Sequence, residues 1–260
     1  MKKILIVEGN TKEENLSFSK KGIKTHTESL KESLNYLTKD ISCDVVNPSS
    51  DRNIEIIHNN LSNYDGMIWG GSSLNIYNNT DEIKKQIDFM RICQKQIRKI
   101  LAICWGLQVA VTAAGGQVKK SNYPHIGIAN KITVNNKGLN NTIYQNKEKI
   151  FNSPAFNFDE VVKLPENAIC LASNKVNKIQ SIFFEINQTK IWGLQYHPEI
   201  TYEKMINLIK FRKDRLINIK RIFKNELEVN KHISFIKKEI IKSSKSKRMM
   251  ELKNWLYQLN

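Results

Sequence analysis

Residues 99–116 read KILAICWGLQVAVTAAGG, a short apolar run that ends at a single cysteine. The run at residues 100–103 is typical of a buried parallel strand, and helix-forming residues begin directly after Cys104. Ala102 and Gly106 are small, as a sharp strand-to-helix turn requires, because such a turn folds its flanking positions against each other. The pattern predicts a nucleophile elbow whose helix N-terminus favours the thiolate of Cys104. A structural cysteine in an apolar core is the alternative.

Strand-like and helix-like segments alternate ahead of this turn. Strands are predicted at residues 3–7, 44–46, 65–69 and 99–103, and helices between them at residues 28–37, 53–61 and 81–98. Such alternation predicts an α/β fold, an open and mostly parallel sheet with helices on both faces. Ligands in such sheets bind beyond the carboxyl ends of the strands, which is where Cys104 lies.

The sequence after this turn is richer in strands. Six are predicted, at residues 117–120, 126–135, 161–164, 169–172, 179–185 and 190–195. Residues 9–26 form a long polar stretch after the first strand, and we expect a loop there that is either functional or mobile.

Composition narrows the class of protein. The 260 residues contain four cysteines with no CxxC pair and no zinc-like spacing with histidines, and the N-terminus does not resemble a signal peptide. We therefore expect a cytoplasmic protein, and no apolar run approaches the roughly 20 residues of a membrane helix.

The net charge of +16 is concentrated in residues 204–260, which carry 16 Lys or Arg and 5 Asp or Glu. No zinc-finger or RNA-binding aromatic pattern accompanies this charge, so nucleic-acid binding is not expected. A solvated, lysine-rich helical surface is the prediction for this segment.

A histidine and a glutamate follow the last predicted strand, in residues 190–199, KIWGLQYHPE. Residues two apart in an extended segment face the same way, so Glu199 can orient the imidazole of His197. Together with an elbow cysteine, this pair has the nucleophile–base–orienter arrangement of a catalytic triad. A strand-ending turn is the alternative for an isolated His-Pro-Glu.

Two glycines directly follow the strand at residues 65–69, in the sequence WGGSS. They allow backbone amides to approach a ligand closely. One such amide, with that of Trp105, is predicted to form an oxyanion hole. A purely steric glycine turn is the alternative.

These three motifs together resemble the class I glutamine amidotransferase family over residues 1 to about 200. Within the family, residues 152–161 (NSPAFNFDEV) most resemble the amidotransferase domain of GMP synthase and its stand-alone relatives. The resemblance implies Cys104 as nucleophile, His197 as base and acid, and Glu199 as orienter. It implies an oxyanion hole from the amides of Gly71 and Trp105, and a glutamine pocket that includes Gly70, Gln108, Asn157 and Phe158.

The chain departs from this family pattern at three places. Ala102 replaces the usual glycine, Gly-Gly-Ser-Ser replaces Gly-Gly-Pro, and Asn157 stands where GMP synthase has a histidine. Nothing resembles the ATP-pyrophosphatase domain of GMP synthase, so GMP synthesis by this chain alone is not expected. The departures leave the chemistry intact and the identity of the substrate open.

We expect two parts, an amidotransferase domain at residues 1–203 and a basic helical extension at residues 204–260. Apolar residues recur at near-helical spacing in the extension. The simplest expectation is that they pack against the main domain. The alternatives are docking of a partner synthase and formation of a homodimer.

The predicted reaction is hydrolysis of the glutamine side-chain amide through a γ-glutamyl thioester, with no metal or organic cofactor. The family implies that the ammonia passes to a separate synthase. One alternative is a hydrolase of γ-glutamyl amines or peptides, and another is a non-catalytic regulatory module of the same fold.

Overall fold

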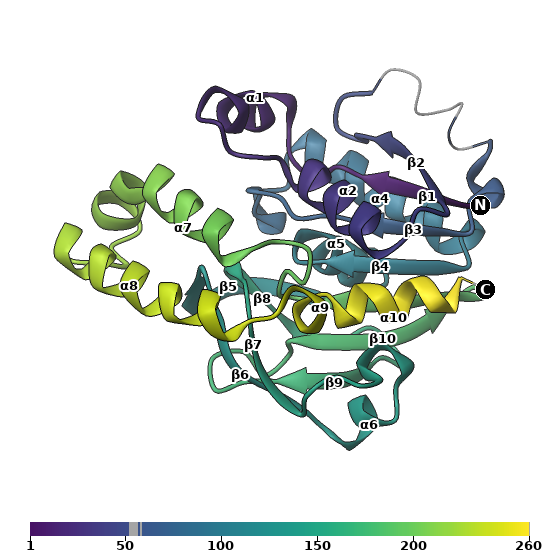
Figure 1. The fold of residues 1–260 in the computed structure, drawn as a ribbon. Coiled ribbons are helices and arrows are strands. Elements are labelled where there is room, and N and C mark those ends of the chain that lie inside the picture. The colour runs from purple at the N-terminus through teal and green to yellow at the C-terminus, as the bar shows by residue number, and fades with distance from the viewer. Residues whose placement is uncertain (52–56, 58, 260) are drawn as a thin grey trace.

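The computed structural model describes residues 1–51, 57 and 59–259 of the chain, and its centre is a nine-stranded sheet in the order β2-β1-β3-β4-β11-β10-β9-β6-β7 (Figure 1). The first five strands are mutually parallel. They are β1 (Lys2–Val7), β2 (Ile41–Val46), β3 (Gly66–Trp69), β4 (Lys99–Ile103) and β11 (Thr189–Leu194). This arrangement confirms the predicted α/β fold with an open sheet.

The other half of the sheet is antiparallel. Its strands are β10 (Ser181–Ile186), β9 (Ile169–Ser173), β6 (Ala129–Val134) and β7 (Ile150–Ser153). A separate two-stranded ribbon pairs β5 (Gln117–Ile126) with β8 (Phe156–Lys163). The prediction from the sequence lacked β7, and β8 begins five residues before the strand predicted at residues 161–164. The polar stretch with its Ser-Pro break has no clear two-residue alternation.

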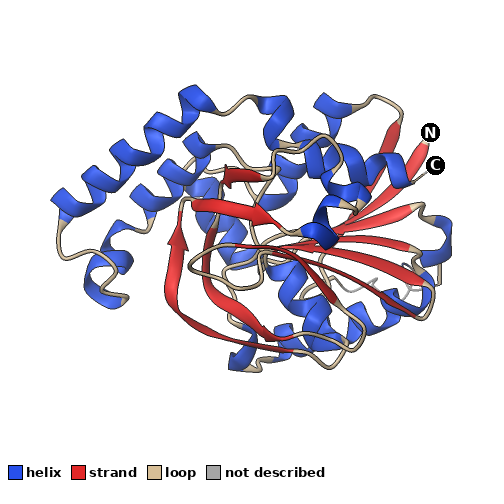
Figure 2. Cartoon of the chain, turned by 90° about the horizontal axis from the view of Figure 1, so that it is seen from below, coloured by secondary structure: helices blue, strands red, loops and turns tan. Residues whose placement is uncertain are grey.

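Alternating side chains of the parallel strands build two separate cores. Leu5 and Val7 face α4 (Asp81–Gln96) and α5 (Trp105–Ala113) on one side. Ile4 and Ile6 face α2 (His26–Leu37) and α10 (Met250–Gln258) on the other. Figure 2 shows helices on both sides of the strands, as the pattern of buried strands predicted.

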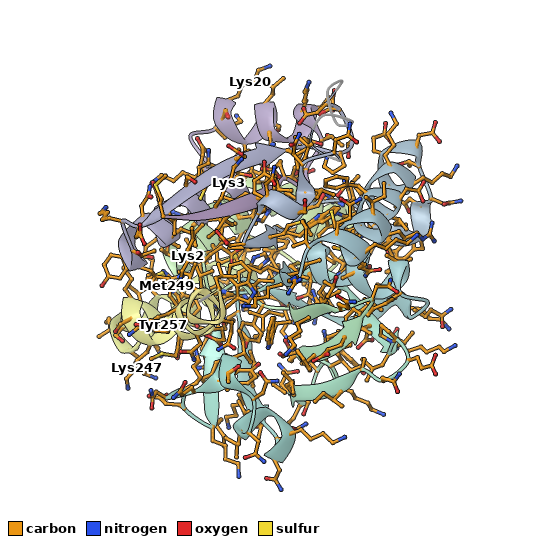
Figure 3. The ribbon with its side chains drawn as sticks, turned by 90° about the vertical axis from the view of Figure 1, so that its right-hand side faces the viewer. Lys2, Lys3, Lys20, Lys247, Met249 and Tyr257 are labelled. Carbon is orange, nitrogen blue, oxygen red and sulfur yellow. The ribbon has the colours of Figure 1, made fainter. Side chains whose placement is uncertain are left out.

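The C-terminal helix α10 completes the second core. Leu252 and Trp255 are fully buried against the sheet, and Lys2 donates a hydrogen bond to the Leu256 carbonyl at 3.1 Å. Figure 3 shows Lys2 and Tyr257 on the same side of the molecule, where β1 and α10 lie together. The apolar side of this helix therefore packs on the rest of the chain, while the division into two domains at residue 203 stays a prediction.

A third core joins the N-terminal and C-terminal segments at one end of the molecule (Figure 1). It lies among α1 (Lys12–Lys20), α7 (Tyr202–Phe211), the π-helical turn η4 (Arg215–Ile219) and α8 (Glu226–Lys242). Phe18 of α1 is buried here, and Thr11 caps the helix by accepting a hydrogen bond from the Glu14 amide. The expectation of a loop at residues 9–26 was therefore wrong for α1, whose short amphipathic turn is stabilised by tertiary packing.

The remaining elements are short. They are α6 (Asn136–Leu139), α9 (Lys245–Arg248), η1 (Leu61–Asn63), η2 (Ile76–Asn78) and η3 (Thr142–Tyr144). The helix predicted at residues 53–61 lies largely outside the described residues. Of the helices that the structure describes, each is too short or too polar to cross a membrane.

Candidate active site

Cys104 lies on a sharp turn between β4 and α5, at the carboxyl edge of the parallel strands. Its backbone has φ 53° and ψ −99°, outside the regions that non-glycine residues favour. The Cys104 amide donates to the Leu194 carbonyl at 2.7 Å, which fixes the turn to β11. A Cβ atom on Gly106 would lie 2.5 Å from the Trp69 carbonyl oxygen, so glycine is required there. Such strain is held in place only by surrounding structure and is common at functional sites.

His197 and Glu199 follow β11, next to this turn. The His197 Nδ1 and a Glu199 carboxylate oxygen are 2.7 Å apart, and both side chains are buried. Burial alone would lower the pKa of His197, but the Glu199 carboxylate and the adjacent Cys104 sulfur outweigh it and raise the pKa to about 10. The imidazole is therefore oriented on one side by Glu199 and faces the sulfur of Cys104 on the other.

The backbone around Glu199 is held from behind by two other segments. Ser33 of α2 donates its hydroxyl to the Glu199 carbonyl at 2.9 Å. The buried guanidinium of Arg248, at the end of α9, donates to the Pro198 carbonyl and to the Ile200 carbonyl, the latter at 2.8 Å. Three consecutive carbonyl groups thus have fixed partners, and the C-terminal segment reaches the candidate active site directly.

The glycine loop after β3 packs on the same turn. The Gly106 amide donates to the Gly70 carbonyl at 3.2 Å, and the Gly70 amide donates to the Val7 carbonyl. A Cβ atom on Gly71 would lie 2.9 Å from the His197 ring. The structure thus brings Gly71 beside the imidazole, while both backbone groups of Gly70 are already engaged within the fold.

A small cavity of about 30 Å³ opens beside the cysteine. Of the residues predicted from the sequence, its walls include Cys104, Trp105, Gln108, Asn157 and Phe158. This space is enough for water and is small for a larger ligand. Larger cavities of about 270 Å³ lie behind Glu199 and beneath the α8–α9 connection, and neither contains Cys104.

Asp159 lines the same cavity and was not singled out from the sequence. Its carboxylate accepts hydrogen bonds from the Asn75 amide at 2.8 Å and the Tyr77 hydroxyl at 2.9 Å. Burial raises the pKa of Asp159 above its ordinary value. The sequence signal that could have identified Asp159 is its position two residues after Asn157, on the same face of β8.

Two arginines of the C-terminal segment also line this cavity, Arg212 and Arg215. Arg212 donates to a Glu14 carboxylate oxygen at 2.7 Å and to the Ser73 hydroxyl. Its guanidinium also lies over the Phe156 ring, 5.3 Å from the centroid. The prediction of a wholly solvated basic surface is therefore wrong for Arg212 and Arg248. The charge of a residue does not show whether its side chain lies on the buried or the exposed side of a helix.

His26, the first residue of α2, stacks on His197 with ring centroids 5.5 Å apart and an interplanar angle of 22°. Its Nδ1 is shielded from solvent without a hydrogen-bond partner, and burial lowers the pKa of this imidazole. Among the described residues, His26, His197 and Glu199 are the one group whose possible metal-ligand atoms lie within 4.8 Å of one another. Two of the three are already paired with each other, so the arrangement favours acid–base chemistry over metal binding.

An open α/β sheet with a cysteine at the end of a central strand and a buried His–Glu pair beside it defines the class of fold, and sequence comparison gives the family. The profile of the class I glutamine amidotransferases matches residues 23–213, and the chain belongs to this family. This confirms the resemblance predicted from the motifs.

Relatives with similar sequences are named for different reactions. A γ-glutamyl-L-1-hydroxyisopropylamide hydrolase of Pseudomonas sp. is 28% identical over 203 residues, covering 76% of this chain and 68% of the relative. One subunit of the glutamine-hydrolysing GMP synthase of Sulfurisphaera tokodaii is 29% identical over 152 residues, covering 58% of this chain and 76% of the relative. γ-Glutamyl peptidase 4 of Arabidopsis thaliana is 29% identical, and the match covers 66% of each chain. These names support a general amide hydrolase activity.

Solved structures share the whole fold. A glutamine amidotransferase from Thermotoga maritima has a TM-score of 0.66 at 18% identity, with coverage of 99% of this chain and 97% of that one. A glutamine amidotransferase from Methylobacillus flagellatus has a TM-score of 0.64 at 13% identity, with coverage of 100% and 96%. The coverage shows that the C-terminal helices are part of a fold found elsewhere.

Proposed function

We propose that this protein hydrolyses the side-chain amide of glutamine to glutamate and ammonia, with Cys104, His197 and Glu199 as a catalytic triad. The observation that carries the proposal is the oriented imidazole of His197, which lies between a strained elbow cysteine and a buried carboxylate. Nucleophile, base and orienter in this order are the minimum set for covalent cleavage of an amide.

In the proposed first step, the Cys104 thiolate attacks the γ-carbonyl carbon of glutamine. The oxyanion that develops accepts hydrogen bonds from the amides of Gly71 and Trp105. His197 then gives its proton to the leaving nitrogen, which departs as ammonia and leaves a γ-glutamyl thioester on Cys104. A raised pKa suits this role, because the imidazole holds the proton until a basic leaving group forms.

In the second step, His197 accepts a proton from water as that water attacks the thioester. The carbon–sulfur bond breaks, glutamate leaves, and the Cys104 thiolate and the protonated His197 are restored. One glutamine and one water give one glutamate and one ammonia. The Glu199 carboxylate accepts a hydrogen bond from Nδ1 throughout and stays ionised, so that the second ring nitrogen always faces the sulfur.

The direct test is labelling with an electrophilic glutamine analogue, read by mass spectrometry. We expect one label, on Cys104, and we expect Cys104→Ala to abolish both labelling and ammonia release. Cys43→Ala is the matched control, since Cys43 lies on β2 away from the site and should keep full activity. Unchanged ammonia release by Cys104→Ala would disprove the mechanism.

Hydrolysis of γ-glutamyl amines is the second candidate. The observation that favours it is the Pseudomonas hydrolase, whose match extends over 203 residues, against 152 for the Sulfurisphaera GMP synthase relative. The same triad serves both reactions, and only the leaving amine differs. Ammonia release from glutamine and amine release from γ-glutamyl methylamide, compared as kcat/KM, will separate the two.

A synthase partner is proposed on the likeness to the Sulfurisphaera GMP synthase relative. If ammonia passes to such a partner, glutamine turnover should rise when an ATP-using synthase encoded nearby is added. Turnover that is equally fast for the chain alone would instead favour the independent hydrolase.

A further inference from the structure

The cavity beside Cys104 has charged groups of both signs in its walls. Arg212 and Arg215 supply positive charge from the C-terminal segment, and Asp159 supplies negative charge from β8. The α-carbon of glutamine carries an ammonium and a carboxylate, which need partners of opposite sign when they leave water. The walls therefore match the head of a zwitterionic amino acid.

Arg212 is the group whose present partner can be exchanged. Its guanidinium is largely buried, and one of its partners is a carboxylate of this chain, that of Glu14 in α1 (Figure 1). A buried guanidinium needs an anionic partner, since an unpaired buried charge is costly. A substrate carboxylate that replaces Glu14 keeps an anionic partner on the buried guanidinium. The displaced Glu14 side chain is already 29% exposed, so water takes the place of Arg212 around its carboxylate.

The cavity is small, about 30 Å³, and Arg212 forms part of its wall. The contact between Glu14 and Arg212 joins α1 to the end of α7, across the Ser73 hydroxyl. Separating Glu14 from Arg212 would both enlarge the cavity and free guanidinium N–H donors toward Cys104.

We propose that Arg212 binds the α-carboxylate of the glutamyl substrate, and that Glu14 holds the guanidinium in place until the substrate displaces it. This inference rests on the proposed function for the identity of the substrate. It makes Arg212 a determinant of specificity, because substrates without a free α-carboxylate cannot replace Glu14. The planar guanidinium suits the role, since it binds a carboxylate through two parallel hydrogen bonds.

The test is equilibrium binding to the full chain carrying Cys104→Ala, which removes turnover. L-Glutamine should bind roughly 10- to 100-fold more tightly than glutamine α-amide, in which a neutral carboxamide replaces the carboxylate, as expected for a charge-assisted hydrogen bond. When Arg212→Gln is added, the dissociation constants of glutamine and glutamine α-amide should differ by no more than about threefold. Arg212→Lys, which keeps the charge but not the paired geometry, should give an intermediate ratio.

The matched control is Lys213→Gln, which removes the same charge one residue away. Lys213 pairs with Glu226 on the outer side of the helices and does not line the cavity. It should keep the ratio of the Cys104→Ala parent. Glu14→Gln should tighten glutamine binding several-fold, because the competing carboxylate is gone.

A ratio that persists in Arg212→Gln would overturn the inference, and so would an absence of glutamine binding to the Cys104→Ala chain. If Glu14→Gln weakened the binding of glutamine and of glutamine α-amide equally, the proposal that the substrate displaces Glu14 would be wrong. The proposed function fails separately, if the wild-type chain binds glutamine with this selectivity but forms no thioester and releases no ammonia.

Discussion

Two arginines from the same C-terminal segment reach the candidate active site from opposite sides, and their partners differ. Arg212 lies in front, beside Cys104, and pairs with a carboxylate on α1. Arg248 lies behind and donates to two backbone carbonyls that flank Glu199. A side-chain carboxylate can be replaced by a substrate carboxylate, whereas a main-chain carbonyl cannot leave without unfolding its loop. The front contact is thus suited to recognition and the rear contact to positioning.

The largest effect is expected at Glu199, which the rear contact holds. Glu199→Gln should lower kcat by about 10⁴-fold, as loss of the orienting carboxylate does in triads generally. NMR of labelled histidine should show His197 titrating near pH 10 in the wild type and clearly lower in the variant, because the carboxylate is the main cause of the raised pKa. Equal titration midpoints would contradict this assignment.

The second prediction concerns Trp255 of α10, which lies in the core on the side of the sheet that faces α2 and α10. It is fully buried against the sheet, and Trp255→Ala should cost about 3–5 kcal/mol of unfolding free energy. Phe235→Ala is the control, because Phe235 on α8 is 42% exposed and should cost little. Chemical denaturation of both variants measures the difference, and equal losses would mean that α10 does not stabilise the core.

Arg248→Met should reduce kcat by roughly 10- to 100-fold with little change in KM, because it loosens the Glu199 segment without touching the substrate. Lys247→Met, one residue earlier, removes the same charge from an exposed side chain and should be nearly neutral. This is the sharpest contrast with Arg212, whose loss should act mainly on binding. If Arg248→Met raised KM and left kcat unchanged, Arg248 would act on substrate binding like Arg212, and its positioning role would be wrong.

The last prediction concerns stability as a function of pH. The folded-state pKa of His197 is raised to about 10, so its protonated form stabilises the fold below its ordinary pKa of about 6.5, and this contribution is lost as the pH rises through 10. Glu199→Gln should therefore lower Tm more at pH 6 than at pH 10.5. A constant difference in Tm would show that the imidazole is neutral throughout.

Much of this picture could be predicted from particular residues. The strand at residues 99–103 was predicted with its exact bounds, because an apolar run that stops at a cysteine and small residues fits few local structures. The parallel half of the sheet followed from alternation of strand and helix. Two elements were less predictable: β7 in the antiparallel half was missed, and α1 after β1 was taken for a loop, because both depend on packing partners far away in the sequence.

The sequence by itself determined the local geometry and the chemical groups: the elbow at Cys104, the His197–Glu199 spacing and the two glycines after β3. The elbow and the glycines follow from short-range sterics, whereas His197 and Glu199 meet in a turn after β11 and not in the extended segment that the sequence predicted. Only the tertiary structure decided which charges leave the surface. Arg212 and Arg248 sit among many lysines and arginines that look alike in the sequence, and a guanidinium is buried only where folding supplies a carboxylate or carbonyl partner for it.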